Sequence, residues 1–370
     1  MNRREFQFSL FALTAGTLFA SKILLGGEES VPAAVAGLYK NSVVIDSLCD
    51  FFANENPTQE AIASVRNSGI TAVNWTVSQD DYEETVNTLA KVAALADANR
   101  DWVTIVRRHA EIAQAKRDGK IGILPGFQNT SFLEANPERI ETFRKLGVRI
   151  MQITYNRRGL FGDGCLESAN GGVTPAGMAA IRKMNDLGVA VDLSHSGYRT
   201  TTEGIAASVK PVLITHSGCA AVYAHPRNKP DEILKALANR GGYFGVYLMP
   251  YLVASPTVPT REHVLAHLTH AINVCGADHV GIGSDGAIEK VVLTAEQKAA
   301  FEKDIAERKA KGIGAPGEDR FPYVPDLNGP QYMEILASEL AKRGQPSSVV
   351  EKVLGGNFHR VLGDIWGTDS

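Results

Sequence analysis

Cysteine is scarce in this chain of 370 residues, which has four, at positions 49, 165, 219 and 275. Four cysteines are too few for a small scaffold held together by disulfides. No two of them have the Cys-x-x-Cys spacing of a structural zinc site, so that class of site is excluded as well. The even number allows one or two disulfides, and the spacing favours no particular pairing.

Net charge and long apolar runs are also lacking. The formal charge is only −3 at neutral pH, which excludes the basic surface that nucleic-acid binding requires, so we expect no nucleic-acid partner. No uninterrupted apolar stretch is long enough for a bilayer, and we therefore expect no membrane span. With 44% hydrophobic residues the chain has ample material for a large buried core instead.

The N-terminal stretch MNRREFQFSLFALTAGTLFAS has the pattern of an export signal. Arg3 and Arg4 precede a moderately apolar segment that polar residues interrupt, which is typical of a twin-arginine signal. This pattern predicts a periplasmic protein. An ordinary secretory signal with a chance arginine pair is the alternative, and it leads to the same compartment.

The end of this signal has two candidate positions, after Ala20 and after Ala36. Both follow small residues of the kind that signal peptidases accept. We assign residues 1–36 to the signal peptide and a linker, and residues 37–370 to one domain.

Eight short apolar runs, each ending in polar residues, recur along the remaining chain. Runs that are apolar on both faces predict buried parallel strands, and the segments between them have the apolar spacing of amphipathic helices. Eight such units favour an α/β fold, a single-domain (β/α)8 TIM-type barrel, over a doubly wound open sheet, which usually has fewer strands. The runs cover residues 42–50, 69–76, 121–129, 148–156, 189–196, 211–217, 242–250 and 279–285.

Two of these runs end in nearly the same heptapeptide, VDLSHSG (191–197) and VLITHSG (212–218). They place His195 and His216 at the carboxyl ends of the fifth and sixth strands, where a barrel builds its active site. Asp285 ends the eighth run. Imidazoles and carboxylates that converge at one barrel end predict a divalent metal site, with zinc preferred. The alternative is that each histidine caps its strand and bonds a neighbouring loop.

At these residues the sequence resembles the membrane (renal) dipeptidase family of metallopeptidases, within the amidohydrolase superfamily. The resemblance extends from about residue 40 to the C-terminus, and the segments that carry it follow the family's order and spacing. They are GVRIMQITYNRR, LGVAVDLSHSG, PVLITHSG, HPRNKPDE, DHVGIGSD and VLGGNFHRVL.

The resemblance implies a role for each matching residue. His195 and His216 match the two histidines that bind one metal of the family's paired site, and Asp285 matches a metal ligand that also accepts a proton. Arg227, in HPRN, matches the arginine that binds the terminal carboxylate of a dipeptide substrate. An arginine fork suits a carboxylate on chemical grounds too. Members of this family often dimerise, so a homodimer is one expectation.

The sequence departs from the family at the second metal. Leu48 stands where the family has a histidine, which leaves only Asp50 of that His-x-Asp pair, and Gln128 replaces the glutamate that bridges the two metals. A neutral amide oxygen is a poor bridge between two cations. We therefore predict one metal, bound by the histidine pair and Asp285, with Gln128 or Asp50 completing its ligands. Tyr155 replaces a substrate-contacting histidine.

Two residues offer substitute ligands. Cys49 is a soft donor next to Asp50, although a buried structural thiol is the favoured interpretation. Glu167, on the loop after the fourth strand, is a candidate replacement carboxylate.

The sequence thus predicts an exported metal-dependent hydrolase that cleaves a dipeptide or small amide with a metal-bound water, while Tyr155 bonds the polarised oxygen. The alternative is a barrel whose catalytic site has decayed and which binds a ligand or assists a partner enzyme. The retained histidine pair favours the enzyme; Leu48 and Gln128 favour decay.

Three further features have structural interpretations. The histidines at 263, 267 and 270 form a stripe on an outer helix, and Cys219 is expected to be a packed thiol. The charged segment 294–312 predicts a solvated helix. The Pro/Gly-rich segment 312–330 predicts a loop over the barrel end, a candidate lid.

Overall fold

The computed structural model describes residues 31–53, 57–134, 136–310 and 314–367. The arginine pair and the apolar stretch of the predicted export signal lie outside the described residues.

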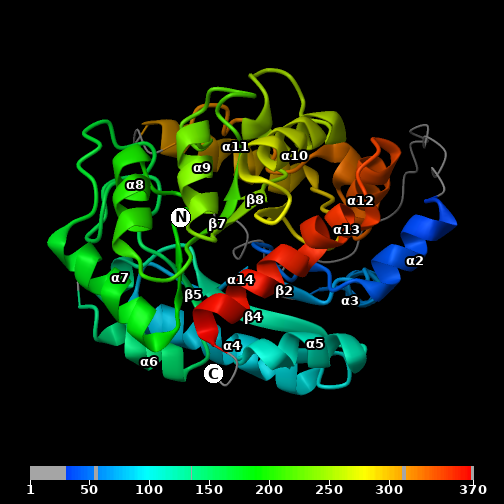
Figure 1. The fold of residues 1–370 in the computed structure, drawn as a ribbon, viewed down its shortest axis with the longest axis horizontal. Coiled ribbons are helices and arrows are strands. Elements are labelled where there is room, and N and C mark those ends of the chain that lie inside the picture. The colour runs from blue at the N-terminus through cyan, green and yellow to red at the C-terminus, as the bar shows by residue number, and fades with distance from the viewer. Residues whose placement is uncertain (1–30, 54–56, 135, 311–313, 368–370) are drawn as a thin grey trace.

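Parallel strands form a nearly closed barrel with helices around it (Figure 1). The strand order is β1-β2-β4-β5-β6-β7-β8-β9. Hydrogen bonds from Ser47 N–H to Ile282 O and from Asp285 N–H to Leu48 O, 2.9 and 2.8 Å long, join the chain that follows β1 to that around the end of β9. The predicted single-domain (β/α)8 barrel is confirmed. The strands are β1 Ile45–Asp46, β2 Ala72–Thr76, β3 Val103–Ile105, β4 Ile121–Phe127, β5 Ile150–Gln152, β6 Ala190–Asp192, β7 Leu213–Ser217, β8 Tyr243–Val246 and β9 Val280–Ile282.

All eight predicted runs contain a strand of the barrel, but the sequence did not predict β3. This strand pairs with the first half of β4, with Val103 opposite Ile121, whereas β5 pairs with the end of β4, with Ile150 opposite Gly126. It is three residues long and only its first residue is buried. Such a short run lacks the continuous apolar pattern by which buried strands are recognised.

Helices follow the strands around the barrel, and α7 illustrates how the sequence specifies them. Thr174 caps its start by accepting a hydrogen bond from Gly177 N–H, Pro175 occupies the first turn, and Gly188 ends the helix in the left-handed region at φ 63°. The helices are α2 Ala33–Asn41, α3 Gln59–Arg66, α4 Tyr82–Ala98, α5 His109–Arg117, α6 Arg139–Lys145, α7 Pro175–Leu187, α8 Tyr198–Ala207, α9 Asp231–Asn239, α10 Arg261–Cys275, α11 Ala295–Ala310, α12 Tyr332–Lys342, α13 Ser347–Glu351 and α14 Asn357–Trp366.

The C-terminal helix α14 covers one end of the barrel. In Figure 1 it crosses in front of the strands. Its buried residues Phe358 and Leu362 pack with Ile45 and Tyr243, the first residues of β1 and β8, and with Leu124 in the middle of β4. The motif VLGGNFHRVL therefore seals the amino end, and the opposite, carboxyl end is where the predicted site residues lie.

Helix α2 begins at Ala33, before the predicted domain boundary at residue 37. Val35 and Tyr39 of this helix are buried in the main hydrophobic core. The folded part of the chain therefore begins within the segment 1–36 that the sequence predicts as signal peptide and linker.

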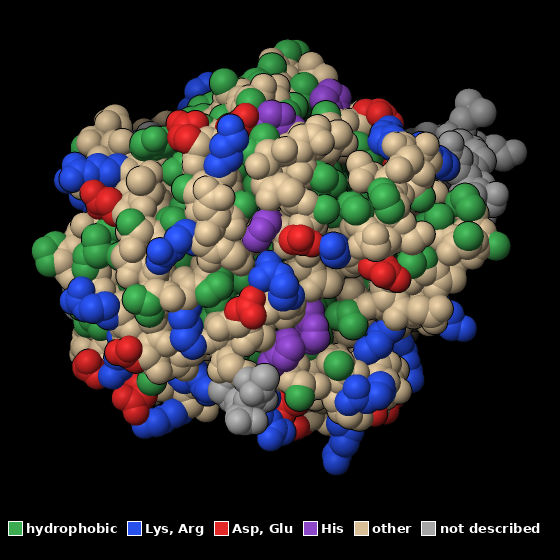
Figure 2. Space-filling model, in the orientation of Figure 1, with side chains coloured by type: hydrophobic (Ala, Val, Ile, Leu, Met, Phe, Trp, Pro, Cys, Tyr) green, Lys and Arg blue, Asp and Glu red, His purple; other side chains and the backbone are tan. Residues whose placement is uncertain are grey.

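The charged segment forms the helix α11, as predicted. Phe301, Asp304 and Arg308 are buried on one side of it. Arg308 donates two hydrogen bonds to Glu318, 2.7 and 3.2 Å long, and thereby ties the following loop to the helix. Over the described residues, no helix has the length and apolar character needed to cross a bilayer. On the face in Figure 2, acidic and basic side chains are interspersed.

Candidate metal centre

The two heptapeptides bring their histidines together at the carboxyl end of the barrel. Strands β6 and β7 are parallel neighbours with Asp192 opposite Leu213, and His195 and His216 each lie three residues beyond that pair. The two Nε2 atoms are 2.9 Å apart. Both side chains are buried, with exposed fractions of 4% and 0%. The predicted convergence of the two imidazoles is therefore present in the structure.

The hydrogen-bond partner of His216 Nδ1 determines the tautomer of this imidazole. Nδ1 lies 2.9 Å from Thr215 Oγ1, and the Thr215 hydroxyl donates its proton to Asp192 Oδ2 at 2.6 Å. A hydroxyl has a single proton. Since the Thr215 hydroxyl uses that proton in its bond to Asp192, its Oγ1 accepts from His216 Nδ1–H. His216 Nε2 then carries a lone pair.

His195 has the same tautomer for a different reason. Its Nδ1 lies 2.7 Å from Asn156 Oδ1, and an amide oxygen can only accept, so Nδ1 carries the proton. The Tyr155 ring stacks on the imidazole with the centroids 4.2 Å apart. The main-chain N–H of His195 donates to Gln152 Oε1 on β5.

Two lone pairs that face each other at 2.9 Å repel, and a proton or a metal cation between them removes that repulsion. Two nitrogen ligands of a tetrahedral zinc ion are about 3.3 Å apart, since each bond is 2.0–2.1 Å long. A small outward rotation of the rings would therefore admit one ion. The donors, the tautomers and the spacing of the pair fit one divalent cation.

Gln128 lies between this pair and Asp285. Its Nε2 is 3.4 Å from His216 Nε2 and donates to Asp285 Oδ1 at 3.2 Å. Within the part of the chain that the structure describes, no three His, Cys, Asp or Glu side chains come together as a metal-binding group. Gln128 thus places a neutral amide between the histidine pair and Asp285.

Asp285 has an unusual backbone conformation, with φ at 56°. This left-handed conformation costs free energy in a non-glycine residue and occurs preferentially at functional sites. Its main-chain N–H donates to Leu48 O. The conformation is stabilised where the chain segments after β1 and β9 meet.

The segment after β1 lacks the histidine ligand that the resemblance to the dipeptidase family implies at position 48. Leu48 is buried and apolar. Asp50 pairs through its backbone with Ala287, two residues after Asp285. Asp50 therefore belongs to a segment that lies beside the loop of the predicted ligand Asp285. The assignment of Asp50 as a metal ligand stays a prediction.

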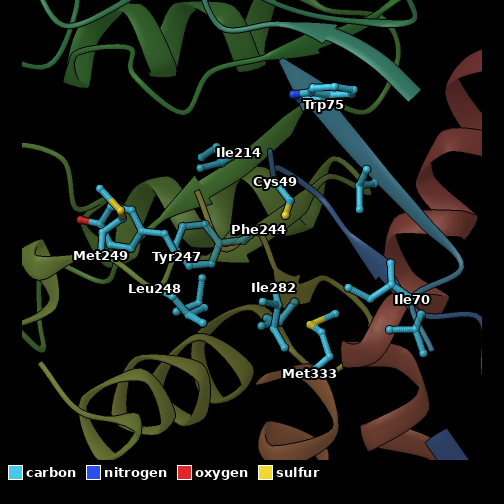
Figure 3. Packing of buried hydrophobic residues seen from close by; sticks show 14 of the residues in the cluster. Cys49, Ile70, Trp75, Ile214, Phe244, Tyr247, Leu248, Met249, Ile282 and Met333 are labelled. Atoms are coloured by element: carbon cyan, nitrogen blue, oxygen red, sulfur yellow. The ribbon is translucent and has the colours of Figure 1, made fainter. Parts of the chain in front are cut away.

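Cys49 is a buried thiol among hydrophobic residues, as Figure 3 shows. Its Sγ donates to Asp50 O at 3.2 Å and lies 4.0 Å from the Tyr332 hydroxyl of α12. Burial raises the pKa of this thiol, and the nearby Asp46 raises it further. A thiol that resists ionisation is a poor metal ligand, which supports the structural interpretation.

Arg227 is a buried side chain, with 2% of its surface exposed. Its Nη1 donates to Ser194 O at 2.6 Å and its Nη2 to His216 O at 3.4 Å. The guanidinium therefore cross-links the two heptapeptides, a role that the sequence did not predict. Its predicted contact with a substrate carboxylate stays a prediction.

His225 connects the Arg227 loop to the predicted lid. Its Nδ1 accepts from Arg227 N–H, its Nε2 donates to Pro316 O at 2.8 Å, and its ring stacks on Tyr251. Burial lowers its pKa to about 4, so it is neutral at physiological pH. The segment from residue 314 onward thus contacts a loop that follows β7, and its assignment as a lid stays a prediction.

The remaining candidates lie elsewhere. His267 accepts from Cys219 N–H and contacts Leu252 O, whereas His270 pairs with Asp231. The histidine stripe therefore has separate structural partners and is no ligand set, and Cys219 is packed beside it. Glu167 Oε1 accepts from Ala169 N–H in its own loop. All four cysteines are free thiols.

Four residues of the site escaped the sequence analysis: Asn156, Asp192, Thr215 and Lys229. The first three support the histidines: Asp192 and Thr215 lie within the two heptapeptides, and Asn156 ends the run 148–156. Lys229 is buried and donates to Ser196 O at 2.5 Å and to Thr201 Oγ1 at 3.3 Å. Burial lowers its pKa to about 7.

The barrel and its histidine pair define the class of this protein, an amidohydrolase-type (β/α)8 barrel. Residues 33–312 match the profile of the membrane dipeptidase family, Peptidase family M19. The chain belongs to that family.

Individual relatives agree. Dipeptidase verJ from Clonostachys rogersoniana is 30% identical over 279 residues, which are 74% of this chain and 63% of that protein. Dipeptidase tcpJ from Claviceps purpurea is 27% identical over 72% of this chain and 56% of its own length. The crystal structure of an amidohydrolase from Pseudomonas aeruginosa has 34% identity and a TM-score of 0.78, and covers 90% of this chain and 99% of its own. The chain therefore spans less than two thirds of the length of these two curated dipeptidases.

Proposed function

We propose that this protein is a metal-dependent hydrolase that cleaves a dipeptide or a small amide with one divalent cation, zinc, held by His195 and His216. The observation that supports this most directly is the pair of Nε2 atoms 2.9 Å apart, each with its proton held on Nδ1 by a specific acceptor. The membership of the dipeptidase family supports a peptide substrate.

A bound divalent cation would lower the pKa of a water molecule and polarise an amide carbonyl. The residues of the chain do the rest. Asp285, whose Oδ1 accepts from Gln128, takes up the proton of the attacking water and passes it to the leaving amine. Tyr155, stacked on His195, donates to the developing oxyanion.

The surroundings of the histidine pair support one cation. Leu48 is an apolar side chain at the position of a ligand, and the Gln128 amide brings no charge to offset the repulsion between two cations. Asp285, with Gln128 or Asp50, completes the ligands in this proposal.

One observation favours a second candidate function, a barrel that binds a ligand without hydrolysing it. The Gln128 amide bonds Asp285 and lies against His216, so it separates the proposed proton acceptor from the histidine pair. In the second candidate these three side chains form a polar network without catalysis.

Alanine variants of the two histidines distinguish the candidates. In the proposed enzyme, His195→Ala and His216→Ala each abolish zinc binding and dipeptide hydrolysis together, because one remaining imidazole holds zinc poorly. His270→Ala, which removes a half-buried contact with Asp231 of α9, is the matched control and retains both. Metal content unchanged in both histidine variants would leave the ligand-binding barrel as the function.

Arg227 is proposed to bind the terminal carboxylate of the substrate. Arg227→Ala should then lower kcat/KM for dipeptides with a free C-terminus by about 2–4 kcal/mol in equivalent free energy. Amidated substrates should lose much less. Equal losses for both substrates would restrict Arg227 to its cross-link between Ser194 O and His216 O.

We also propose periplasmic export through Arg3 and Arg4, and a homodimer by analogy with the family. Replacement of both arginines by lysine should retain the chain in the cytoplasm with its signal uncleaved. Normal delivery of that variant would exclude a twin-arginine route.

A further inference from the structure

Asp192 is a fully buried carboxylate that neither the proposed reaction nor the proposed ligand set uses. It accepts four hydrogen bonds. Two come from Ser194, from the main-chain N–H at 3.0 Å and from Oγ at 2.5 Å. Two come from Thr215, from the main-chain N–H at 3.2 Å and from Oγ1 at 2.6 Å. Asp192 of the heptapeptide 191–197 thus holds Thr215 of the heptapeptide 212–218 in place.

These bonds fix the protons of both hydroxyls. A carboxylate is only an acceptor, so the Ser194 and Thr215 protons both point at Asp192. Their lone pairs are left to accept from His216. Ser194 Oγ accepts from the His216 main-chain N–H at 3.2 Å, and Thr215 Oγ1 accepts from Nδ1–H.

The hydrogen-bond acceptor of His195 is neutral, whereas the group that supports His216 is bonded to a carboxylate. Its Nδ1–H donates to the neutral amide of Asn156, whereas the Nδ1–H of His216 donates to a hydroxyl that a carboxylate polarises. Hydrogen bonds in such a chain strengthen one another. Carboxylates that support a metal-binding histidine raise its basicity as a ligand.

We propose that Asp192 and Thr215 form a carboxylate–hydroxyl–imidazole relay that orients His216 and increases the electron density at its Nε2. Asp192 and Thr215 are positioning residues in this relay, because they act through His216. The relay makes His216 the stronger of the two histidine ligands. This inference rests on the proposed metal site.

Thr215→Val tests the relay with little change in shape, since only the hydroxyl is lost. Thr215→Ser is the matched control, because it retains the hydroxyl and loses the methyl group. The readout is the zinc dissociation constant of each metal-free protein, measured by competition with a chromogenic chelator. Thr215→Val is expected to bind zinc about 10–100-fold more weakly than the parent, and Thr215→Ser within a few-fold of it.

The outcomes separate this inference from the proposed function. If the parent binds zinc and Thr215→Val binds it equally well, the relay is wrong while the metal site stands. If Thr215→Ser loses as much affinity as Thr215→Val, packing of the threonine matters and the relay is again overturned. A parent that binds no zinc overturns both proposals.

A variant with the opposite effect guards against a folding defect in Thr215→Val. Asn156→Asp replaces the neutral acceptor of His195 with a carboxylate, at a site where Asn156 Oδ1 already accepts from Nδ1–H at 2.7 Å. Zinc affinity should then rise, by about 10-fold. Damage to the structure would not tighten binding, so an unchanged or weaker affinity would contradict the electronic effect on which the relay depends.

Discussion

In the proposed metal site, Gln128 is the side chain that limits the number of bound cations to one. Its Nε2 donates to Asp285 Oδ1 and lies 3.4 Å from His216 Nε2, so it takes the place of a bridging carboxylate while it brings no negative charge. A second cation would meet the repulsion of the first without compensation. One substitution at this residue therefore changes the electrostatics of the whole site.

Gln128→Glu should tighten zinc binding, because it places a negative charge beside the histidine pair. Leu48→His combined with Gln128→Glu rebuilds most of the family's second site and should raise both the metal content and the dipeptidase activity over those of the parent. Metal analysis and a dipeptide assay measure the two effects. A double variant that gains neither would show that the backbone around Leu48 and Gln128 has moved too far for a second ion.

His267 makes the stability of the fold sensitive to acid. Its Nδ1 accepts from Cys219 N–H and its Nε2 donates to Leu252 O, and burial lowers its pKa to about 4. The folded state holds this histidine neutral, while the unfolded chain takes up a proton near the ordinary histidine pKa of about 6.5. The stabilisation is therefore complete above about pH 6.5 and is lost as the pH falls toward 4, by about 3 kcal/mol in total.

His267→Gln should reduce this dependence, because an amide can accept from Cys219 N–H and donate to Leu252 O without titrating. Urea unfolding between about pH 7 and pH 4.5 measures how the free energy of unfolding depends on pH. His225 and His359, whose pKa values burial also lowers to about 4, retain the same acid sensitivity in the variant. A parent and a variant with the same slope of stability against pH would contradict the assignment to His267.

At the scale of elements, the sequence predicted all eight barrel strands, because each is a continuous apolar run with polar residues at its end. It missed β3, since three residues with a single buried side chain give no pattern. It found His195 and His216 through their repeated heptapeptides. It could not find the bond between Asp192 and Thr215, which depends on the pairing of β6 with β7 and on the rotamer of each side chain.

Gly283, which follows β9, lies against Thr215 of β7 and Ser47, which follows β1. A Cβ at Gly283 would lie 2.0 Å from Thr215 O and 2.6 Å from Ser47 Oγ. The first obstacle is backbone, and it is the carbonyl that precedes His216. Only glycine fits here without displacing the segment that carries this histidine.

Gly283→Ala should destabilise the protein by about 1–3 kcal/mol in urea unfolding and weaken zinc binding as well. The control is Gly37→Ala, on an exposed position of α2 where an added Cβ meets nothing within 4 Å. Alanine in a helix should stabilise the protein there by up to about 1 kcal/mol. A tolerated Gly283→Ala would mean that β7 can move without loss of the site.

On the scale of the whole molecule, the two ends of the barrel have separate tasks. The amino end is filled by α14 against Ile45, Leu124 and Tyr243. The carboxyl end holds polar side chains in a buried network that runs from Asp192 through the histidines to Gln128 and Asp285. Burial strengthens each interaction in that network.

The metal content of the protein, purified without added metal, tests this account most directly. One divalent cation on the histidine pair predicts about one equivalent of zinc per chain by elemental analysis. The same analysis of His195→Ala should find almost none. Two equivalents in the parent would show that Gln128 and Leu48 do not prevent a second ion, and a parent without metal would contradict the metal centre itself.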